Sequence, residues 1–138
     1  MSFVLDASVA LVWCFEAEHT EPVIALLARL TETGATVPQL WPLEALNGLI
    51  MAERRGRIDP ARRGRLATFL RQLPVAVDDE TTMRLWDATA QLAERHRLTA
   101  YDATYLELAL RLALPLATVD RALMAAANAT GVRILPAA

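Results

Sequence analysis

The stretch F-V-L-D-A-S-V-A-L-V-W-C-F at residues 3–15 decides the fold. Its first three residues form a short apolar run, which is typical of a strand buried on both faces. Asp6 interrupts the apolar pattern, and Ala7 to Phe15 then has the composition of a helix. The stretch therefore predicts a strand that leads directly into a helix, with a carboxylate at the junction.

The same alternation of strand and helix continues along the chain. Short apolar runs predict further strands at residues 36–37, 75–77, 116–117 and 132–135. Between them, periodic apolar positions and start signals predict helices at about 20–34, 42–56, 59–73, 80–97, 101–113 and 121–129. No hairpin, repeat, linker or low-complexity segment appears. The pattern predicts one domain over residues 1–138, with an α/β layer fold around a parallel sheet.

Composition limits the class of protein. The chain has 138 residues, of which 54% are apolar and 22% charged, so it has the material for a substantial core. A single cysteine, Cys14, excludes an internal disulfide framework and suits a reducing compartment. The N-terminus has no basic region, and Asp6 breaks its apolar stretch, so neither a signal peptide nor a membrane span is expected. We expect a cytoplasmic protein that does not enter a membrane.

The charges are segregated along the chain. The formal net charge is −2, which argues against nonspecific nucleic-acid binding by the whole surface. All 14 basic residues are arginine, and six of them fall within residues 54–65. Arg54, Arg55 and Arg57 are candidates for contact with the phosphate backbone of a nucleic acid. A solvated helix face and a surface for a partner protein are the alternatives for this cluster.

Four acids, each at the start of a predicted helix, are the candidate functional residues. Each has an ordinary structural explanation. Asp6 and Asp120 have the position of N-caps, and Asp102 follows Thr99 by three residues, which is close to a capping-box pattern. Glu44 lies in a first helical turn, where a negative charge meets the helix dipole favourably.

Together the four acids also fit a metal site. Asp6 and Asp120 follow predicted strands, and the carboxyl ends of parallel strands meet at the edge where sites form. Helices that start from that edge would bring Glu44 and Asp102 to the same place. Clustered carboxylates repel one another, and oxygen ligands of this kind suit Mg²⁺ or Mn²⁺. Such a site suits the hydrolysis of phosphodiester bonds, with polar support from neighbouring side chains: Ser8, Asn47 and Thr118.

The order and spacing of these motifs resemble the PIN-domain nucleases, and in particular the VapC-type toxins of bacterial toxin–antitoxin pairs. The likeness covers essentially the whole chain, and no single motif is specific by itself. It rests on four segments in order: V-L-D-A-S at 4–8, L-W-P-L-E-A-L-N-G-L at 40–49, Y-D-A-T-Y-L-E-L-A at 101–109 and L-A-T-V-D-R-A-L at 116–123.

The resemblance implies a fold and an activity. It implies a three-layer α/β/α architecture with a five-stranded parallel sheet, and cleavage of RNA that depends on Mg²⁺ or Mn²⁺. The acids that carry over as catalytic and metal-binding residues are Asp6, Glu44, Asp102 and Asp120. The resemblance also implies a homodimer, and an antitoxin protein that holds the enzyme inactive.

Two other functions compete with a toxin. The same fold could serve RNA processing or act on DNA, without a toxin role. The chain could also be a catalytically idle domain that binds a partner, with its four acids serving only as helix caps.

Overall fold

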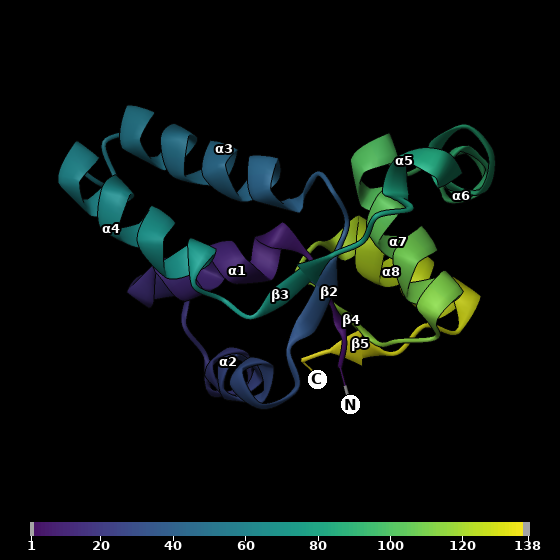
Figure 1. Cartoon of the computed structure of the whole chain (residues 1–138), viewed down its shortest axis with the longest axis horizontal. Coiled ribbons are helices and arrows are strands. Elements are labelled where there is room, and N and C mark those ends of the chain that lie inside the picture. Colours follow the sequence, from purple (N-terminus) through teal and green to yellow (C-terminus); the bar gives the residue numbers. More distant parts are fainter. Residues whose placement is uncertain (1, 137–138) are drawn as a thin grey trace.

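A five-stranded parallel sheet lies at the centre of the computed structural model, which describes residues 2–136 (Figure 1). The strand order is β3-β2-β1-β4-β5, and every neighbouring pair is parallel. This confirms the predicted α/β fold. The strands are short: β1 Val4–Leu5, β2 Ala35–Val37, β3 Val75–Val77, β4 Leu116–Ala117 and β5 Ile134–Leu135.

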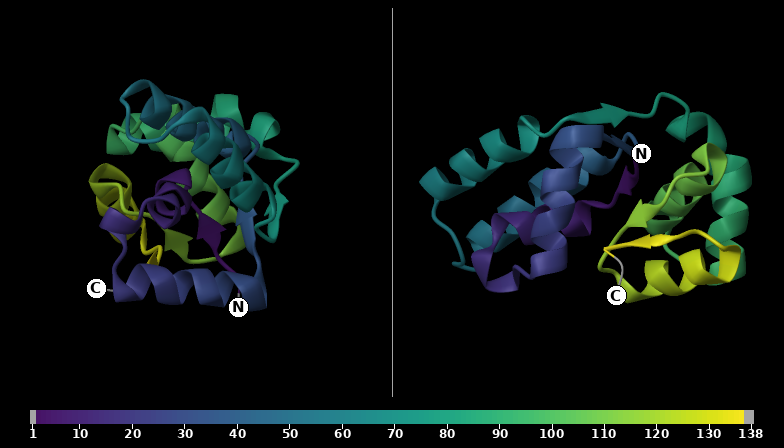
Figure 2. Two further views of the ribbon diagram at one scale, coloured as in Figure 1. Left: turned by 90° about the vertical axis from the view of Figure 1, so that its left-hand side faces the viewer. Right: turned by 90° about the horizontal axis from the view of Figure 1, so that it is seen from below.

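Helices cover both sides of the sheet. Helices α1 to α4 lie on one side and α5 to α8 on the other, and α3 and α4 form a long hairpin that projects from the body (Figures 1 and 2). The helices are α1 Ala7–Cys14, α2 Glu21–Thr33, α3 Trp41–Arg54, α4 Pro60–Arg71, α5 Thr81–Arg84, α6 Ala90–His96, α7 Ala100–Leu112 and α8 Arg121–Thr130. A short 3-10 turn, η1 Glu16–Glu18, was not predicted.

The helix predicted at 80–97 is interrupted. A π-helical turn, η2 Leu85–Thr89, separates α5 from α6. A π-helical turn widens a helix locally, while apolar residues at helical spacing continue on either side of it. For this reason the apolar periodicity predicted one continuous helix.

Several predicted helix starts are confirmed by hydrogen bonds. Thr20 accepts from the backbone N–H of Val23 at 3.4 Å, and Asp59 accepts from that of Arg62 at 2.7 Å. At the other end of α2, Gly34 has a φ of 67°, a conformation that glycine adopts without strain. These local signals place α2 and α4 as the sequence indicated.

The strand order reverses at β1. Its partner β2 lies on one side and β4 on the other, with Leu5 aligned with Ala117. Strands β1 and β4 are buried on both faces. In open parallel sheets, ligands bind outside the carboxyl ends of the strands at such a reversal, so the residues that follow β1 and β4 occupy the expected place for a site. Among residues 2–136, no helix has the length and apolar content needed to cross a membrane.

Candidate active site at the carboxyl edge of the sheet

Asp6, directly after β1, is held by two hydroxyl groups. Ser8 Oγ and Thr118 Oγ1 each donate a hydrogen bond to Asp6 Oδ2 at 2.7 Å. The Asp6 side chain is 5% exposed and makes no capping hydrogen bond to α1, although it stands at the N-cap position. Its carboxylate is instead oriented by Ser8 and Thr118, the two hydroxyl residues predicted to support it.

The segment after β4 is tied to the start of α1. Val119 N–H donates to Ser8 Oγ at 3.3 Å, and Asp120 N–H donates to Thr118 Oγ1 at 3.0 Å. Asp120 Oδ1 accepts from the backbone N–H of Leu123 at 2.9 Å, so the predicted cap of α8 is confirmed. Asp120 thus serves as a cap through Oδ1 and still lies at the same edge as Asp6.

Glu44 meets a tyrosine that the sequence analysis did not identify as part of the site. The hydroxyl of Tyr105, on α7, donates to Glu44 Oε1 at 2.5 Å. Tyr105 is fully buried, so this hydrogen bond joins α3 to α7 beneath the edge. The signal available in the sequence was spacing, because Tyr105 lies three residues after Asp102 and therefore on the same side of a helix.

Asp102 lies in the first turn of α7, and its backbone N–H donates to Thr99 Oγ1 at 3.1 Å. Its pKa is raised from 3.8 to about 6. Burial is the largest cause, followed by repulsion from Asp120, Asp6 and Glu44. Because Asp102 responds to all three of the other acids, the four predicted carboxylates share one electrostatic environment at this edge.

The charged forms of Asp6 and Glu44 are also destabilised by burial and by repulsion. Burial raises the pKa of Asp6, against the hydrogen bonds from Ser8 and Thr118, and Asp120 raises it further by repulsion. Burial also raises the pKa of Glu44, against the Tyr105 hydrogen bond, with a further rise caused by Asp6. Carboxylates in this state favour either protons or cations.

The donor set at this edge fits a hard divalent cation. The four acids offer only oxygen ligands, as Mg²⁺ and Mn²⁺ prefer, and their mutual repulsion is what a cation would relieve. The oxygens of these acids are not gathered into a closed cage, since no three of them lie within 4.8 Å of one another among the described residues. Mg²⁺ keeps several water ligands in protein sites, so an open arrangement is compatible with it.

A different acidic group is more tightly clustered. Asp78, Asp79 and Glu80, between β3 and α5, offer oxygens that all lie within 4.8 Å of one another. Arg111 already pairs with two of them, with N···O distances of 2.7 Å to Asp78 and 3.3 Å to Glu80. It also pairs with the buried Glu107 at 2.9 Å. An arginine therefore supplies positive charge to this group, whereas the four acids at the sheet edge make no ion pair among residues 2–136.

The model of the PIN domain family matches residues 3–129 of this chain. The chain belongs to the PIN domain family. The match includes all four acids of the edge, and the resemblance of the four sequence segments is thereby confirmed at the level of the family. No curated protein sequence matches the chain significantly.

Solved structures share the fold of this PIN domain. PAE2754 from Pyrobaculum aerophilum has 25% sequence identity and a TM-score of 0.70, over 98% of this chain and 90% of that one. FitAcB from Neisseria gonorrhoeae has 20% identity and a TM-score of 0.66, over 97% and 96%. The structure of VapBC2 from Rickettsia felis, solved with a DNA fragment from the VapBC2 promoter, has 14% identity and a TM-score of 0.65, over 97% of each chain.

The remaining predicted residues of the PIN domain lie along α3 and just beyond it. Asn47 is exposed, less than one turn past Glu44, and makes no hydrogen bond among the described residues. Arg54 and Arg55 are exposed at the opposite end of α3, about 15 Å from Glu44 at 1.5 Å per residue. Arg57 is engaged within the chain. It pairs with Glu18 at 3.3 Å, and its guanidinium lies 4.2 Å from the centroid of the Phe15 ring.

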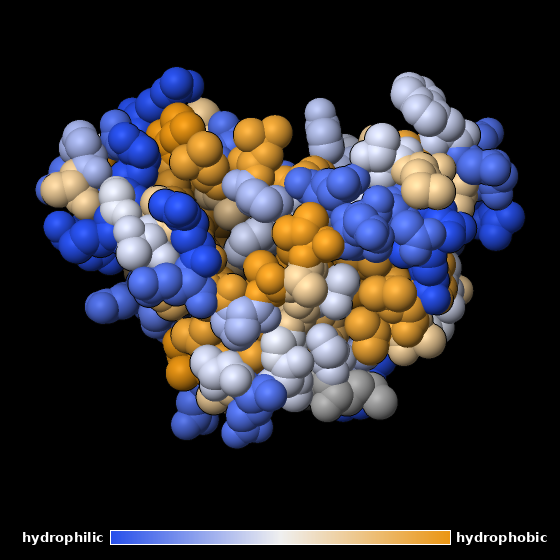
Figure 3. Space-filling view, in the orientation of Figure 1, coloured by the Kyte–Doolittle hydropathy of each residue, from blue (hydrophilic) through white to orange (hydrophobic). Residues whose placement is uncertain are grey.

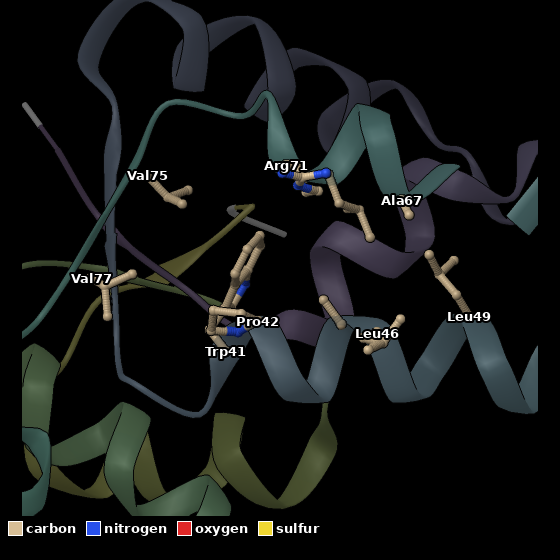
Figure 4. Close-up of a pocket in the computed structure, with 10 residues that line it drawn as sticks. Trp41, Pro42, Leu46, Leu49, Ala67, Arg71, Val75 and Val77 are labelled. Carbon is tan, nitrogen blue, oxygen red and sulfur yellow. The ribbon is translucent and has the colours of Figure 1, made fainter. Parts of the chain in front are cut away.

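An apolar pocket of about 440 Å³ lies apart from the acids, between α3, α4 and β3 (Figure 4). Apolar side chains form most of its wall, and Arg71 is its only charged lining residue. The Nε1 atom of Trp41, which also lines the pocket, is buried and has no hydrogen-bond partner among residues 2–136. Since no carboxylate lines this pocket, it is a feature of the PIN domain distinct from the acidic edge.

Proposed function

We propose that this PIN domain is a Mg²⁺- or Mn²⁺-dependent endoribonuclease, and that it acts as the toxin of a type II toxin–antitoxin pair. The observation that carries the proposal is the electrostatic coupling of Asp102 to Asp6, Glu44 and Asp120 at the carboxyl edge of the sheet. Four carboxylates from four separate parts of the chain would be costly together without a cation.

The side chains of the chain have separate roles in this proposal. Asp6, Glu44, Asp102 and Asp120 would hold the ions. Ser8 and Thr118 fix the orientation of the Asp6 carboxylate, and Tyr105 fixes that of Glu44. A bound divalent cation would lower the pKa of an attacking water and neutralise charge on the phosphate. The protein thus contributes ligands already oriented for phosphodiester hydrolysis.

The partner proposal rests on fold and surface. VapBC2 and FitAcB share the fold of this chain, and the VapC-type resemblance implies an antitoxin protein and a homodimer. The cytoplasmic location is proposed from the single cysteine and the N-terminal sequence. The apolar pocket between α3 and α4 is a surface suited to the apolar side chains of a protein partner. An antitoxin held there would lie on the same helix that carries Glu44.

The test is cleavage by the purified, antitoxin-free protein. Total RNA is incubated with Mn²⁺ or Mg²⁺, and EDTA and an Asp6→Asn variant provide the negative controls. The matched control is Asp79→Asn, which removes a carboxylate from the other acidic group. We expect discrete cleavage with the wild type and with Asp79→Asn, and none with Asp6→Asn or EDTA.

Other outcomes separate the alternatives. Cleavage of DNA but not RNA would favour a DNA-directed nuclease. Absence of cleavage together with absence of Mn²⁺ binding by calorimetry would return the acids to the role of helix caps and favour an idle binding domain. Cleavage that persists in Asp6→Asn would contradict the assignment of the active site.

A further inference from the structure

Exposed apolar side chains stand next to three of the four acids in the sequence. Three of the four acids are each preceded, one residue earlier, by a large apolar side chain that is open to solvent. Their exposed fractions are 71%, 64% and 41% for Leu43, Tyr101 and Val119 respectively. We call these three residues the apolar rim. Apolar side chains next to charged ones at a site indicate a ligand with both apolar and charged parts.

Tyr101 is the aromatic member of the rim, and α7 fixes its direction. Tyr101 and Tyr105 are four residues apart, so they lie on the same face of the helix, one above the other. Tyr105 reaches Glu44 on α3. Tyr101 therefore lies on the side of α7 that faces α3, one turn of about 5.4 Å closer to the N-terminus of the helix.

The exposure of Tyr101 contrasts with the buried middle of its helix. Residues 103–109 of α7 are all buried, whereas the ring of Tyr101 is open. Within residues 2–136 its hydroxyl has no hydrogen bond and its ring no ring contact. Packing within the chain therefore does not account for an aromatic residue beside Asp102.

We propose that the ring of Tyr101 stacks on an unpaired base of the RNA and so positions the adjacent phosphate at the four acids. This inference rests on the proposed nuclease function and adds Tyr101 as a residue that positions the substrate. Cations held by the four acids would attract any phosphate of the RNA backbone alike, so a contact with a base is needed to select which phosphate is placed at the edge. A base offers an apolar face to an aromatic ring only when it is unpaired and unstacked.

Trp86 provides a matched control. It is 90% exposed, more than Tyr101. Arg84 and Ala88, two positions before and after it, line the same pocket as Arg111, which lies about 14 Å along α7 from Asp102. Trp86 is therefore an exposed aromatic residue at the end of α7 away from the acids, and stacking at the edge does not involve it.

The test uses short single-stranded RNA oligonucleotides that contain a mapped cleavage site. We expect Tyr101→Ala to raise KM by about five- to 150-fold, which corresponds to stacking worth ~1–3 kcal/mol per base. Tyr101→Phe keeps the ring and should keep KM within about twofold of the wild type. Trp86→Ala should leave KM unchanged. Mn²⁺ affinity and the melting temperature, measured in parallel, show whether Tyr101→Ala keeps its fold and its metal site.

Abasic substitution identifies the stacked base. One nucleotide at a time is replaced by an abasic residue around the cleavage site. At one position, the abasic substitution should raise the KM of the wild type by the same factor as Tyr101→Ala raises it on the intact RNA. For Tyr101→Ala, the abasic residue at that position should cause no further rise in KM, because the same interaction has already been removed. The same RNA held in a duplex should be cleaved much more slowly than the single strand.

Three results would overturn the inference while leaving the proposed nuclease activity intact. They are an unchanged KM in Tyr101→Ala, a rise in KM in Trp86→Ala equal to that in Tyr101→Ala, or a rise in KM in Tyr101→Phe as large as in Tyr101→Ala. An unchanged KM combined with weaker self-association would assign the apolar rim to a protein interface. Failure of the wild type to cleave any RNA would instead refute the proposed function, and the role of Tyr101 with it.

Discussion

Substitution of Asp102 by asparagine separates a metal site from a helix cap by the sign of its effect on stability. As an acid in the first turn of α7, Asp102 would interact favourably with the helix dipole, and its loss would cost about 0.3–1 kcal/mol. As one of four crowded carboxylates, it is destabilised by burial and by repulsion from its neighbours. In that case Asp102→Asn stabilises the metal-free protein.

The size of the effect follows from the pKa. The pKa of Asp102 is raised from 3.8 to about 6. At about 1.4 kcal/mol per pKa unit, this corresponds to a destabilisation of the folded protein by at most about 3 kcal/mol. Because the side chain is partly exposed, solvent screening reduces this to about 1–2 kcal/mol. For a chain of this size, that gain raises the melting temperature by about 3–8 °C.

The dependence on pH has a defined sign. The folded protein holds the proton of Asp102 more tightly than the unfolded chain does, so this group lowers stability as the pH rises from about 3.8 to about 6. The penalty is complete above pH 6. The gain in stability on Asp102→Asn should therefore be full at pH 7.5 and fall to about a third of that value at pH 4.5.

Urea and thermal unfolding in EDTA, at both pH values, measure this effect. Asp79→Asn, at an exposed acid outside the edge, is the control and should change stability by less than about 0.5 kcal/mol. Adding Mn²⁺ should stabilise the wild type and Asp79→Asn but not Asp102→Asn. A loss of stability in Asp102→Asn at pH 7.5 would refute the reasoning and identify Asp102 as a dipole-stabilising acid.

Three further predictions concern other contacts. Thr118→Val removes a donor to Asp6, so it should lower the free energy of unfolding by about 1–2 kcal/mol at pH 7.5 and weaken Mn²⁺ binding; unchanged affinity in calorimetry would contradict this role. Arg111→Met leaves the buried carboxylates of Asp78 and Glu107 unpaired and should lower the free energy of unfolding by about 3–5 kcal/mol. Because Arg111 lowers the pKa of Asp78, this loss of stability should be present at neutral pH and shrink as the pH falls below 3.8. Replacing Arg54 and Arg55 together by alanine should reduce the slope of log affinity against log salt by about 1.4 if both contact single-stranded RNA; an unchanged slope would exclude that contact.

The sequence by itself determined the local elements of this PIN domain. Caps and turn residues act on their immediate neighbours, so Thr20, Gly34 and Asp59 located the ends of their helices correctly. Short apolar runs located the strands; in β1 and β4 the run reflects burial on both faces, whereas the edge strand β3 is apolar although it is largely exposed. The π-helical turn at Leu85–Thr89 was missed, since the apolar pattern continues on both sides of it.

The sequence also indicated which acids to consider, but it left two interpretations of each. Asp6 and Asp120 both precede helices and are equivalent as patterns. In the tertiary structure, Asp120 caps α8 through Oδ1, whereas Asp6 is turned toward Ser8 and Thr118. The difference depends on the alignment of β1 with β4, which brings together residues 112 positions apart in the chain.

Only the tertiary structure decided how residues from different elements meet at the edge. Tyr105 donates to Glu44 across 61 positions of sequence, and Arg57 lies on Phe15 and Glu18 instead of standing free. Contacts of this kind are set by how helices pack on the sheet, and no local signal records them. The sequence therefore determined which groups were available, and the packing of α3, α7 and α8 around the carboxyl edge decided which of them act on one another, because burial and repulsion depend on distance through space rather than along the chain.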